Sequence, residues 1–403
     1  MNEVLMLKVT GDDQLGLTSS LTTILAQANI TILDIGQSVI HDQVSLGMLL
    51  KFPESEDVSN TIKNVLFCAH ELGIRAVFTP VSSDSYEQWV SQQGKDRFIL
   101  TLLGRQLSGS NIAAVSKVIS HQGLNIQDIT RLTDRQPLEL PNNESKSCIE
   151  FSLRGLPNNP DQLRAEFLEI CAEHNVDIAF QEDNVYRRNR RLVAFDMDST
   201  LIEAEVIDEL AKEAGVGEQV AHITEMAMQG KLDFNESFKQ RMALLKGLDE
   251  SVLAKIADRL PITEGAERLI RTLKQYGYKT AILSGGFNYF GKHLQQKFGI
   301  DYVYANELEI KDGKVTGNVI GQIVNGERKA ELLKEIAEKE NIRIEQTIAV
   351  GDGANDLPML SLAGLGIAFR AKSIVEQSAK QSISTLGLDG VLYLLGFKDQ
   401  DII

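Results

Sequence analysis

Residues 192–200 read Leu-Val-Ala-Phe-Asp-Met-Asp-Ser-Thr, an apolar run that ends in two aspartates one residue apart. Such a run is typical of a buried strand in a parallel sheet, and these sheets bind ligands at the carboxyl ends of their strands. Asp196 and Asp198 point to the same side of an extended chain, so they repel each other unless a proton or a cation intervenes. Mg2+ prefers such oxygen ligands, and the pair therefore indicates a magnesium site.

Three further motifs follow along the chain. Residues 281–286 read Ala-Ile-Leu-Ser-Gly-Gly, a second strand whose final hydroxyl and N–H groups can hold phosphate oxygens. Lys329 lies near the start of a helical stretch, and residues 347–356 form a third strand that ends in Gly-Asp-Gly-Ala-Asn-Asp. Taken alone, each motif has an ordinary explanation as a solvated turn, a strand-to-helix connection or a surface lysine. Together and in this order they favour a metal and phosphate site.

In this order the motifs resemble those of the haloacid dehalogenase superfamily of aspartate-nucleophile phosphatases, and the resemblance covers residues 190–403. It implies an α/β catalytic domain with a doubly wound parallel sheet and a helical cap inserted at about residues 205–262. Strands and helices alternate in such a sheet. Matching apolar runs are found at 192–196, 279–284, 302–305 and 346–351.

The resemblance also implies a role for each motif residue. Asp196 would be the nucleophile that forms an aspartyl-phosphate, and Asp198 would protonate the leaving oxygen and then activate water. Mg2+ would be held by Asp196, by the backbone carbonyl of Asp198 and by Asp352, with Asp356 orienting the water shell of the ion. Residues binding the phosphate oxygens would be Ser284, Gly285 and Lys329, with Asn355 beside them.

A further group of residues concerns the substrate. Arg241 lies in an apolar helical stripe, where its guanidinium either reaches past its neighbours to solvent or grips a carboxylate in a closed pocket. We favour the pocket, because Glu205 then has a matching role as the partner of an ammonium rather than as an exposed helix acid. An acid and an arginine beside a phosphate site select a phosphorylated amino acid. The residues of the stripe are Phe234, Phe238, Arg241, Met242 and Leu245.

Within the superfamily, the chain is similar to the branch that hydrolyses O-phospho-L-serine in the last step of serine biosynthesis. The residues that stand where this branch keeps its substrate contacts are Glu205, Met228, Phe234 and Arg241. Three alternatives remain: a phosphotransferase to an alcohol such as homoserine, or a phosphatase for another metabolite; an amino-acid sensor with a vestigial phosphatase fold; and a dehalogenase. The intact acids argue against the last two. The preference for L- or D-phosphoserine stays open.

Composition and charge exclude other classes of function. The 403 residues are 43% hydrophobic, enough for two or three domains with real cores, and the net charge of −15 disfavours binding to nucleic acid or anionic membranes. No apolar stretch approaches the roughly 20 residues that cross a bilayer, and residues 1–8 resemble a strand rather than a signal peptide. The cysteines at 68, 148 and 171 form no CxxC motif, which favours a reducing cytoplasm.

The first half of the chain contains a repeat. Residues 4–9 align with 98–103 at an offset of 94, and Ile30, Ile32 and Asp34 align with Leu124, Ile126 and Asp128. The inferred order is βαββαβ twice, a ferredoxin-like pattern. Polar residues 82–94 would link the two copies, residues 134–146 would form a loop in the second, and the arginines of 187–191 would form a solvated linker or an interdomain contact.

The repeat resembles a tandem pair of ACT domains, modules that bind amino acids, at residues 1–85 and 95–185. This resemblance implies a serine effector that binds near the loops after the first strands, and a homodimer formed by side-by-side pairing. The alternative is that the pair is only an assembly platform, and the direction of any serine effect stays open. Candidate effector contacts are Asp13, Gly16, Gly104 and Gly109.

Overall fold

The computed structural model of the chain describes residues 3–54, 57–91, 94, 96–137, 145–228 and 231–403. The chain divides into two compact units, Met1–Lys95 and Asp96–Ile403. The second unit combines the second predicted module with the α/β domain, and the division into three domains stays a prediction. Among the described residues, no helix has both the length and the apolar character that crossing a membrane requires.

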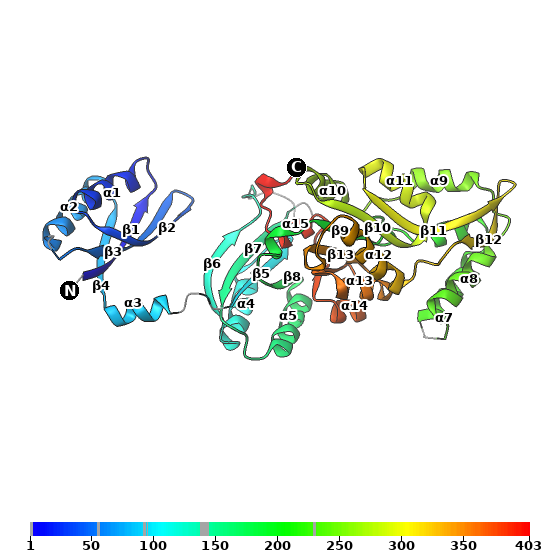
Figure 1. Cartoon of the computed structure of the whole chain (residues 1–403), viewed down its shortest axis with the longest axis horizontal. Helices are drawn as coiled ribbons and strands as arrows, with labels where there is room; N and C mark the ends of the chain where they lie inside the picture. The colour runs from blue at the N-terminus through cyan, green and yellow to red at the C-terminus, as the bar shows by residue number, and fades with distance from the viewer. Residues whose placement is uncertain (1–2, 55–56, 92–93, 95, 138–144, 229–230) are drawn as a thin grey trace. The chain divides into compact units, whose positions relative to one another are not determined.

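The first unit is a βαββαβ module followed by a short helix (Figure 1). Its antiparallel sheet has the strand order β2-β3-β1-β4 and buries Leu5, Leu7 and Val9 of the first strand under two helices. The expected linker at 82–94 is in large part helical, because the Ser82 side chain accepts from the N–H of Ser85 and caps helix α3. The elements are β1 Glu3–Asp12, α1 Leu17–Gln27, β2 Thr31–Ile40, β3 Gln43–Phe52, α2 Val58–Glu71, β4 Arg75–Val81 and α3 Ser83–Val90.

The second unit begins with another βαββαβ module, and its sheet has the corresponding order β6-β7-β5-β8. A register shift, or β-bulge, also occurs at the same place in both modules. It lies between Ile32 and Asp34 of β2 in the first module and between Ile126 and Asp128 of β6 in the second. The two modules therefore share strand order and bulge. Ile32 pairs with Leu50 and Leu50 with Leu5, whereas Ile126 pairs with Leu153 and Leu153 with Phe98. The first strands thus correspond at an offset of 93, and the predicted alignment of residues 4–9 with 98–103 is wrong by one residue. The elements are β5 Arg97–Gly104, α4 Gly109–His121, β6 Asn125–Arg131, β7 Ser147–Arg154, α5 Pro160–His174 and β8 Asp177–Glu182. Of the expected loop at 134–146, residues 138–144 lie outside the described residues.

The α/β domain is built on a sheet with the strand order β12-β11-β10-β9-β13-β14-β15. Successive residues of β9 point to opposite faces: Val193 packs in the core that contains α10 and α11, and Ala194 packs in the core that contains α12 and α13. The doubly wound prediction is confirmed. Its elements are β9 Leu192–Phe195, α10 Ala266–Gln275, β10 Lys279–Phe287, α11 Asn288–Phe298, β11 Tyr302–Lys311, α12 Gly326–Lys339, β13 Thr347–Gly351, α13 Leu357–Leu362, β14 Leu365–Phe369, α14 Ser373–Ser378, β15 Gln381–Ile383 and α15 Gly390–Leu394.

A strand that the sequence analysis does not predict, β12 Lys314–Ile320, turns back antiparallel from β11 at the edge of the sheet. It supports the helical cap, because Gly317 has a φ of +88° and lies against Ala243 of the cap. The N–H of Gly247 also donates to the carbonyl of Val315 at 2.8 Å. The cap helices are α6 Val206–Glu213, α7 Gly217–Met228, α8 Phe234–Leu244 and α9 Ser251–Arg259.

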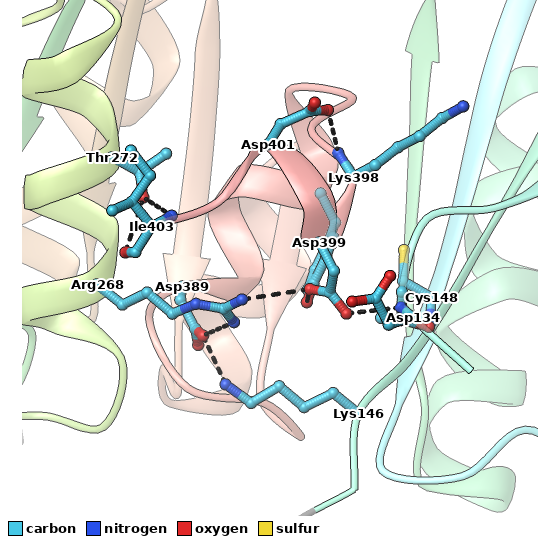
Figure 2. A network of polar contacts seen from close by, with 12 residues as sticks. Asp134, Lys146, Cys148, Arg268, Thr272, Asp389, Lys398, Asp399, Asp401 and Ile403 are labelled. Carbon is cyan, nitrogen blue, oxygen red and sulfur yellow. Dashed lines mark hydrogen bonds and ion pairs between the residues drawn. The ribbon is translucent and has the colours of Figure 1, made fainter. Parts of the chain in front are cut away.

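The second module is joined to the α/β domain by a network of polar contacts around the C-terminal segment (Figure 2). Asp389, only 1% exposed, pairs with Lys146 of the module and with Arg268 of α10. Asp399 accepts from the N–H of Asp134 at 2.7 Å and lies 3.4 Å from Arg268. The buried carboxylate of Asp389 is thus paired with two partly exposed cations from the two sides of the junction, and residues 96–403 form one compact unit.

Two arginines of the segment 187–191 are buried in contacts between the second module and the α/β domain, which is one of the two predictions, whereas Arg188 and Arg191 are exposed. Arg187 is 6% exposed and pairs with Glu150 of β7. Arg190 is equally buried and donates to the carbonyls of Glu345 and Thr347 at 3.1 and 3.2 Å.

Candidate active site

The motif residues meet because β9 lies between β10 and β13 in the parallel sheet, so the ends of three strands converge. Asp196 follows β9, Ser284 lies on β10 and Asp352 follows β13. The sequence motifs that are far apart along the chain thus form a single cluster, as the resemblance implies.

A buried lysine connects two of the acids. The Nζ atom of Lys329, on α12, lies 3.0 Å from the carboxylate of Asp196 and 2.7 Å from that of Asp356. Lys329 and Asp356 are fully buried and Asp196 is 5% exposed. Burial and the charge of Asp356 raise the pKa of Asp196, and Lys329 opposes this rise. The lysine therefore holds the predicted nucleophile in place and offsets part of the charge around it.

Asp198 has a different environment from Asp196. Its carboxylate accepts from the N–H of Val206, the first residue of α6, at 2.9 Å, and from the hydroxyl of Ser284 at 3.4 Å. Burial, followed by the nearby charge of Glu205, raises its pKa to about 8. Asp198 can thus hold a proton near neutral pH, as an acid that protonates a leaving group requires.

Oxygen atoms of Asp196, Asp352 and Asp356 all lie within 4.8 Å of one another. An all-oxygen set of this kind fits a hard divalent cation. The sequence analysis assigns Asp356 to the water shell, but the structure places it within the cluster, where Lys329 and the N–H of Gly353 hold its carboxylate. Thr200, a residue that the sequence analysis does not single out, donates to Asp352 at 3.3 Å.

The cluster makes the metal-free protein sensitive to pH. Burial and the charge of Asp356 raise the pKa of Asp352 from 3.8 to about 7. The folded chain then binds more protons than the unfolded chain between about pH 4 and 8, so stability falls as the pH rises. In chelator, we expect the melting temperature to fall from pH 5.5 to 8 and Mg2+ to restore much of it at pH 8. The Asp352→Asn variant should show a weaker fall; an equal fall would contradict this origin.

A cavity of about 880 Å3 opens between the cluster and the cap. Phe234, Phe238 and Arg241 of α8 line it, together with Glu205. Phe238 and Met242 of the same helix also pack in the hydrophobic core. Burial lowers the pKa of Arg241, and the charges of Glu205 and Asp208 oppose this decrease. An acid and an arginine therefore face the same cavity as the aspartates. Predicted site residues in its wall are Asp196, Asp198, Glu205, Phe234, Arg241, Gly285, Asp352 and Asn355.

The glycines after Ser284 allow close approach. A Cβ atom on Gly286 would lie 2.3 Å from the carboxylate of Asp198, and one on Gly285 would lie 3.1 Å from the ring of Phe234. Ser284 is fully buried and accepts from the N–H of Gly286 at 2.9 Å. Met228 ends α7, and its side chain lies outside the described residues. The double-glycine motif thus brings the predicted acid and the cap together.

The predicted effector residues lie in differing surroundings. Gly16 begins α1 with a φ of +88°, and the N–H of Asp13 donates to the carbonyl of Asp42. Gly104 is buried and Gly109 exposed, and between them Arg105 pairs with Glu264 of the α/β domain at 2.7 Å. The second loop therefore already has a partner, which the sequence analysis does not anticipate.

Comparison with known proteins defines the class. A family model described as haloacid dehalogenase-like hydrolase matches residues 193–361, and one described as ACT domain matches residues 3–79. The phosphoserine phosphatase of Streptomyces coelicolor is 38% identical over 398 residues, which cover 99% of this chain and 93% of the relative. That of Mycobacterium tuberculosis is 37% identical over 392 residues, with coverage of 97% and 92%. The chain is a haloacid dehalogenase-like hydrolase with an N-terminal ACT domain. It belongs to the family of these two phosphoserine phosphatases.

Solved structures agree with this assignment. A haloacid dehalogenase family hydrolase of Salmonella enterica serovar Typhi superposes with a TM-score of 0.63 and 31% identity, covering 74% of this chain and 98% of that one. A probable phosphoserine phosphatase of Vibrio cholerae, in unliganded form, has a TM-score of 0.59 and 35% identity, with coverage of 74% and 86%. The assignment of the second module as an ACT domain stays a prediction.

Proposed function

We propose that the protein is a cytoplasmic, Mg2+-dependent phosphatase that hydrolyses O-phospho-L-serine to L-serine and phosphate through an aspartyl-phosphate. The observation that carries the proposal is the shared cavity, whose wall contains Asp196, Asp198 and Asp352 as well as Glu205 and Arg241. Asp196 and Asp352 also belong to the three-carboxylate cluster. The names of the relatives support the same activity.

In this mechanism the Asp196 carboxylate attacks phosphorus, and the Asp198 carboxylic acid gives its proton to the departing serine oxygen. Asp198 then takes a proton from the water that cleaves the aspartyl-phosphate. Ser284, the N–H of Gly285 and Lys329 stabilise charge on the equatorial oxygens. Asp196, Asp352 and the backbone carbonyl of Asp198 would hold Mg2+, with Asp356 beside them; the bound ion supplies charge neutralisation for the phosphoryl group.

The cap gives the specificity. Arg241 is placed to bind the serine carboxylate and Glu205 to bind its ammonium, with Phe234, and Met228 as the resemblance implies, packed beside the substrate. Ser199 donates to Glu205 at 2.8 Å and orients the carboxylate. A phosphate ester without an amino acid group would lack both contacts.

The test of the function is phosphate release from a panel of phosphorylated metabolites, with Mg2+ or with chelator. Phosphoserine should be the preferred substrate, chelator should abolish turnover, and Ca2+ should substitute poorly because it is larger and takes more ligands. Full activity in chelator would contradict the mechanism. Less phosphate release on addition of homoserine, with serine still formed and phosphohomoserine as the second product, would identify a phosphotransferase instead.

Arg241→Ala should lower kcat/KM for phosphoserine about ten- to a hundredfold, because a charge-assisted hydrogen bond contributes about 1.5–3 kcal/mol. Hydrolysis of p-nitrophenyl phosphate, which has no carboxylate, should change much less. The matched control is Arg259→Ala, since Arg259 lies on the outer cap helix α9 and pairs with surface acids. Equal losses on both substrates would assign Arg241 a structural role.

We also propose that the chain forms a homodimer and that serine binds the N-terminal half, near the loops that contain Asp13, Gly16, Gly104 and Gly109, and lowers activity. The ACT domain at residues 3–79 supports an amino-acid effector. The test compares serine titrations of the full chain and of a truncation that starts at residue 96, the boundary between the compact units. A truncation that starts near residue 187 would instead remove Asp177 and leave the backbone N–H groups of Ser384 and Thr385, which donate to its carboxylate at 2.9 Å, without that partner. Identical serine curves would leave the first module as an assembly platform.

A further inference from the structure

A second cavity, of about 220 Å3, lies within the unit that comprises residues 96–403, between the second module and the α/β domain. Helix α5 and strand β8 form one side, and the segment from α14 to β15 forms the other. Cavities for drug-sized ligands measure roughly 300–1,000 Å3, so this cavity suits a small metabolite. It is separate from the cavity that contains the aspartates.

The body of this cavity is apolar. Leu163 and Phe167 of α5 and Ile178 and Phe180 of β8 line it, and the rings of Phe167 and Phe180 are 6.1 Å apart. Buried faces of this kind bind an apolar group by removing its surface from water. The half-buried Cys171 lies in the same wall.

Charged side chains of both signs also line the cavity. Glu376 of α14 accepts from the hydroxyl of Ser384 at 2.7 Å, and Lys380 is exposed. Arg164 of α5 donates to the carbonyls of Gln377 and Ala379, which fastens the end of α14 to the second module. An acid and a lysine beside an apolar pocket complement a zwitterion that carries an apolar side chain.

One segment of the chain, residues 372–382, contributes to the walls of both cavities. Glu376, Ala379 and Lys380 line the junction, whereas Lys372 and Val375 of the same segment line the space around the aspartates. Burial raises the pKa of Glu205, and Lys372 is one of the groups that oppose this rise. A shift of this segment would therefore alter the substrate side of the catalytic cavity.

We propose that the junction cavity binds a free α-amino acid with a large apolar side chain, of the size of phenylalanine or leucine. Its carboxylate would bind Lys380, its ammonium Glu376, and its side chain the surface formed by Leu163, Phe167 and Phe180. The bound amino acid acts through residues 372–382 and changes the affinity of the catalytic cavity for the phosphate ester. This second part of the proposal rests on the proposed function. Such coupling requires unequal affinity of the effector for two positions of this segment.

Calorimetric titration of the full chain with L-phenylalanine tests the binding without any assay of activity. L-phenylalanine should bind at least tenfold more tightly than 3-phenylpropanoate, which lacks the ammonium, and than 2-phenylethylamine, which lacks the carboxylate. Lys380→Gln should weaken binding about tenfold, whereas Lys117→Gln, at an exposed position of α4, should not. Equal binding of the three compounds, or unchanged binding by Lys380→Gln, would overturn the proposal.

A second pair of variants locates the site. Cys171→Trp should fill the cavity and abolish binding, and Cys68→Trp, at a half-buried cysteine on α2 of the first module, should leave it intact. Melting curves establish whether each variant folds. If Cys171→Trp does not fold, the binding measured for Lys380→Gln tests the location of the site. Wild-type affinity in folded Cys171→Trp would refute the location.

Kinetics test the coupling. Saturating L-phenylalanine should change KM for phosphoserine at least twofold in the wild type and less in Lys380→Gln. Binding of L-phenylalanine without any change in KM would refute the coupling, although the junction cavity would still be a binding site. If phosphoserine is not a substrate, the calorimetric titration with L-phenylalanine still tests the junction cavity. Failure of the proposed function can therefore be distinguished from failure of this inference.

Discussion

Asp196→Asn is expected to lower turnover by a factor on the order of 10^4 or more, the scale seen when a nucleophile is removed. An amide is a poor nucleophile, yet its oxygen can still accept the hydrogen bond that Met197 N–H donates at 2.7 Å. Because burial and Asp356 raise the pKa of Asp196, the neutral amide also relieves repulsion. The metal-free variant should therefore be at least as stable as the wild type.

The measurement is phosphate release, with mass spectrometry to exclude deamidation of the new asparagine. Asp258→Asn is the matched control, because Asp258 is exposed on the cap helix α9. Substantial turnover by the Asp196 variant would rule out the covalent mechanism. A variant that folds poorly but turns over substrate at the wild-type rate per folded molecule would also rule out the covalent mechanism.

Lys329→Met should have the second-largest effect, on stability and activity together. The methionine keeps the unbranched stem as far as Cε but leaves Asp196 and Asp356 buried without the ammonium that pairs with both. Removing one partner of a buried ion pair costs about 3–5 kcal/mol. Turnover should fall by a factor on the order of 10^2–10^3, as when one donor to a developing anion is lost.

Urea unfolding at pH 7.5 in chelator, together with phosphate release in Mg2+, measures the two effects. Lys334→Met on the same helix is the control, since Lys334 is 66% exposed and lies 3.9 Å from Glu338. Unchanged stability of Lys329→Met would show that the two aspartates hold protons in place of the ion pair. Unchanged turnover would remove Lys329 from the phosphate site.

Much of this protein follows from local patterns. Apolar runs that end in Asp196, Ser284 and Asp352 predict strand ends, and a parallel sheet brings such ends to one edge. The period of Phe238 and Met242 predicts which face of α8 is buried, and both side chains are buried as expected. The repeat at an offset of 94 residues predicts two modules with the same strand order.

Other features depend on contacts between segments that are distant in sequence, and no local period reports them. The strand β12, at residues 314–320, carries no signal of its role in supporting the cap, because that role comes from its contact with α8. Asp356 belongs to the carboxylate cluster because Lys329, 27 residues earlier, holds it there. The burial of Arg187 and Arg190 reverses the surface character that an arginine-rich segment usually has.

The residues that meet at the edge of the α/β sheet were therefore predictable from sequence, since strand ends, acids and glycines are local features that a parallel sheet brings together. The attachment of the second module was not, because Asp177, Gln381 and Asp389 become interdomain contacts through packing between segments some 200 residues apart. Polar side chains of this kind resemble surface residues in a sequence. They are buried here because each finds a hydrogen-bonding or charged partner that compensates for the loss of water.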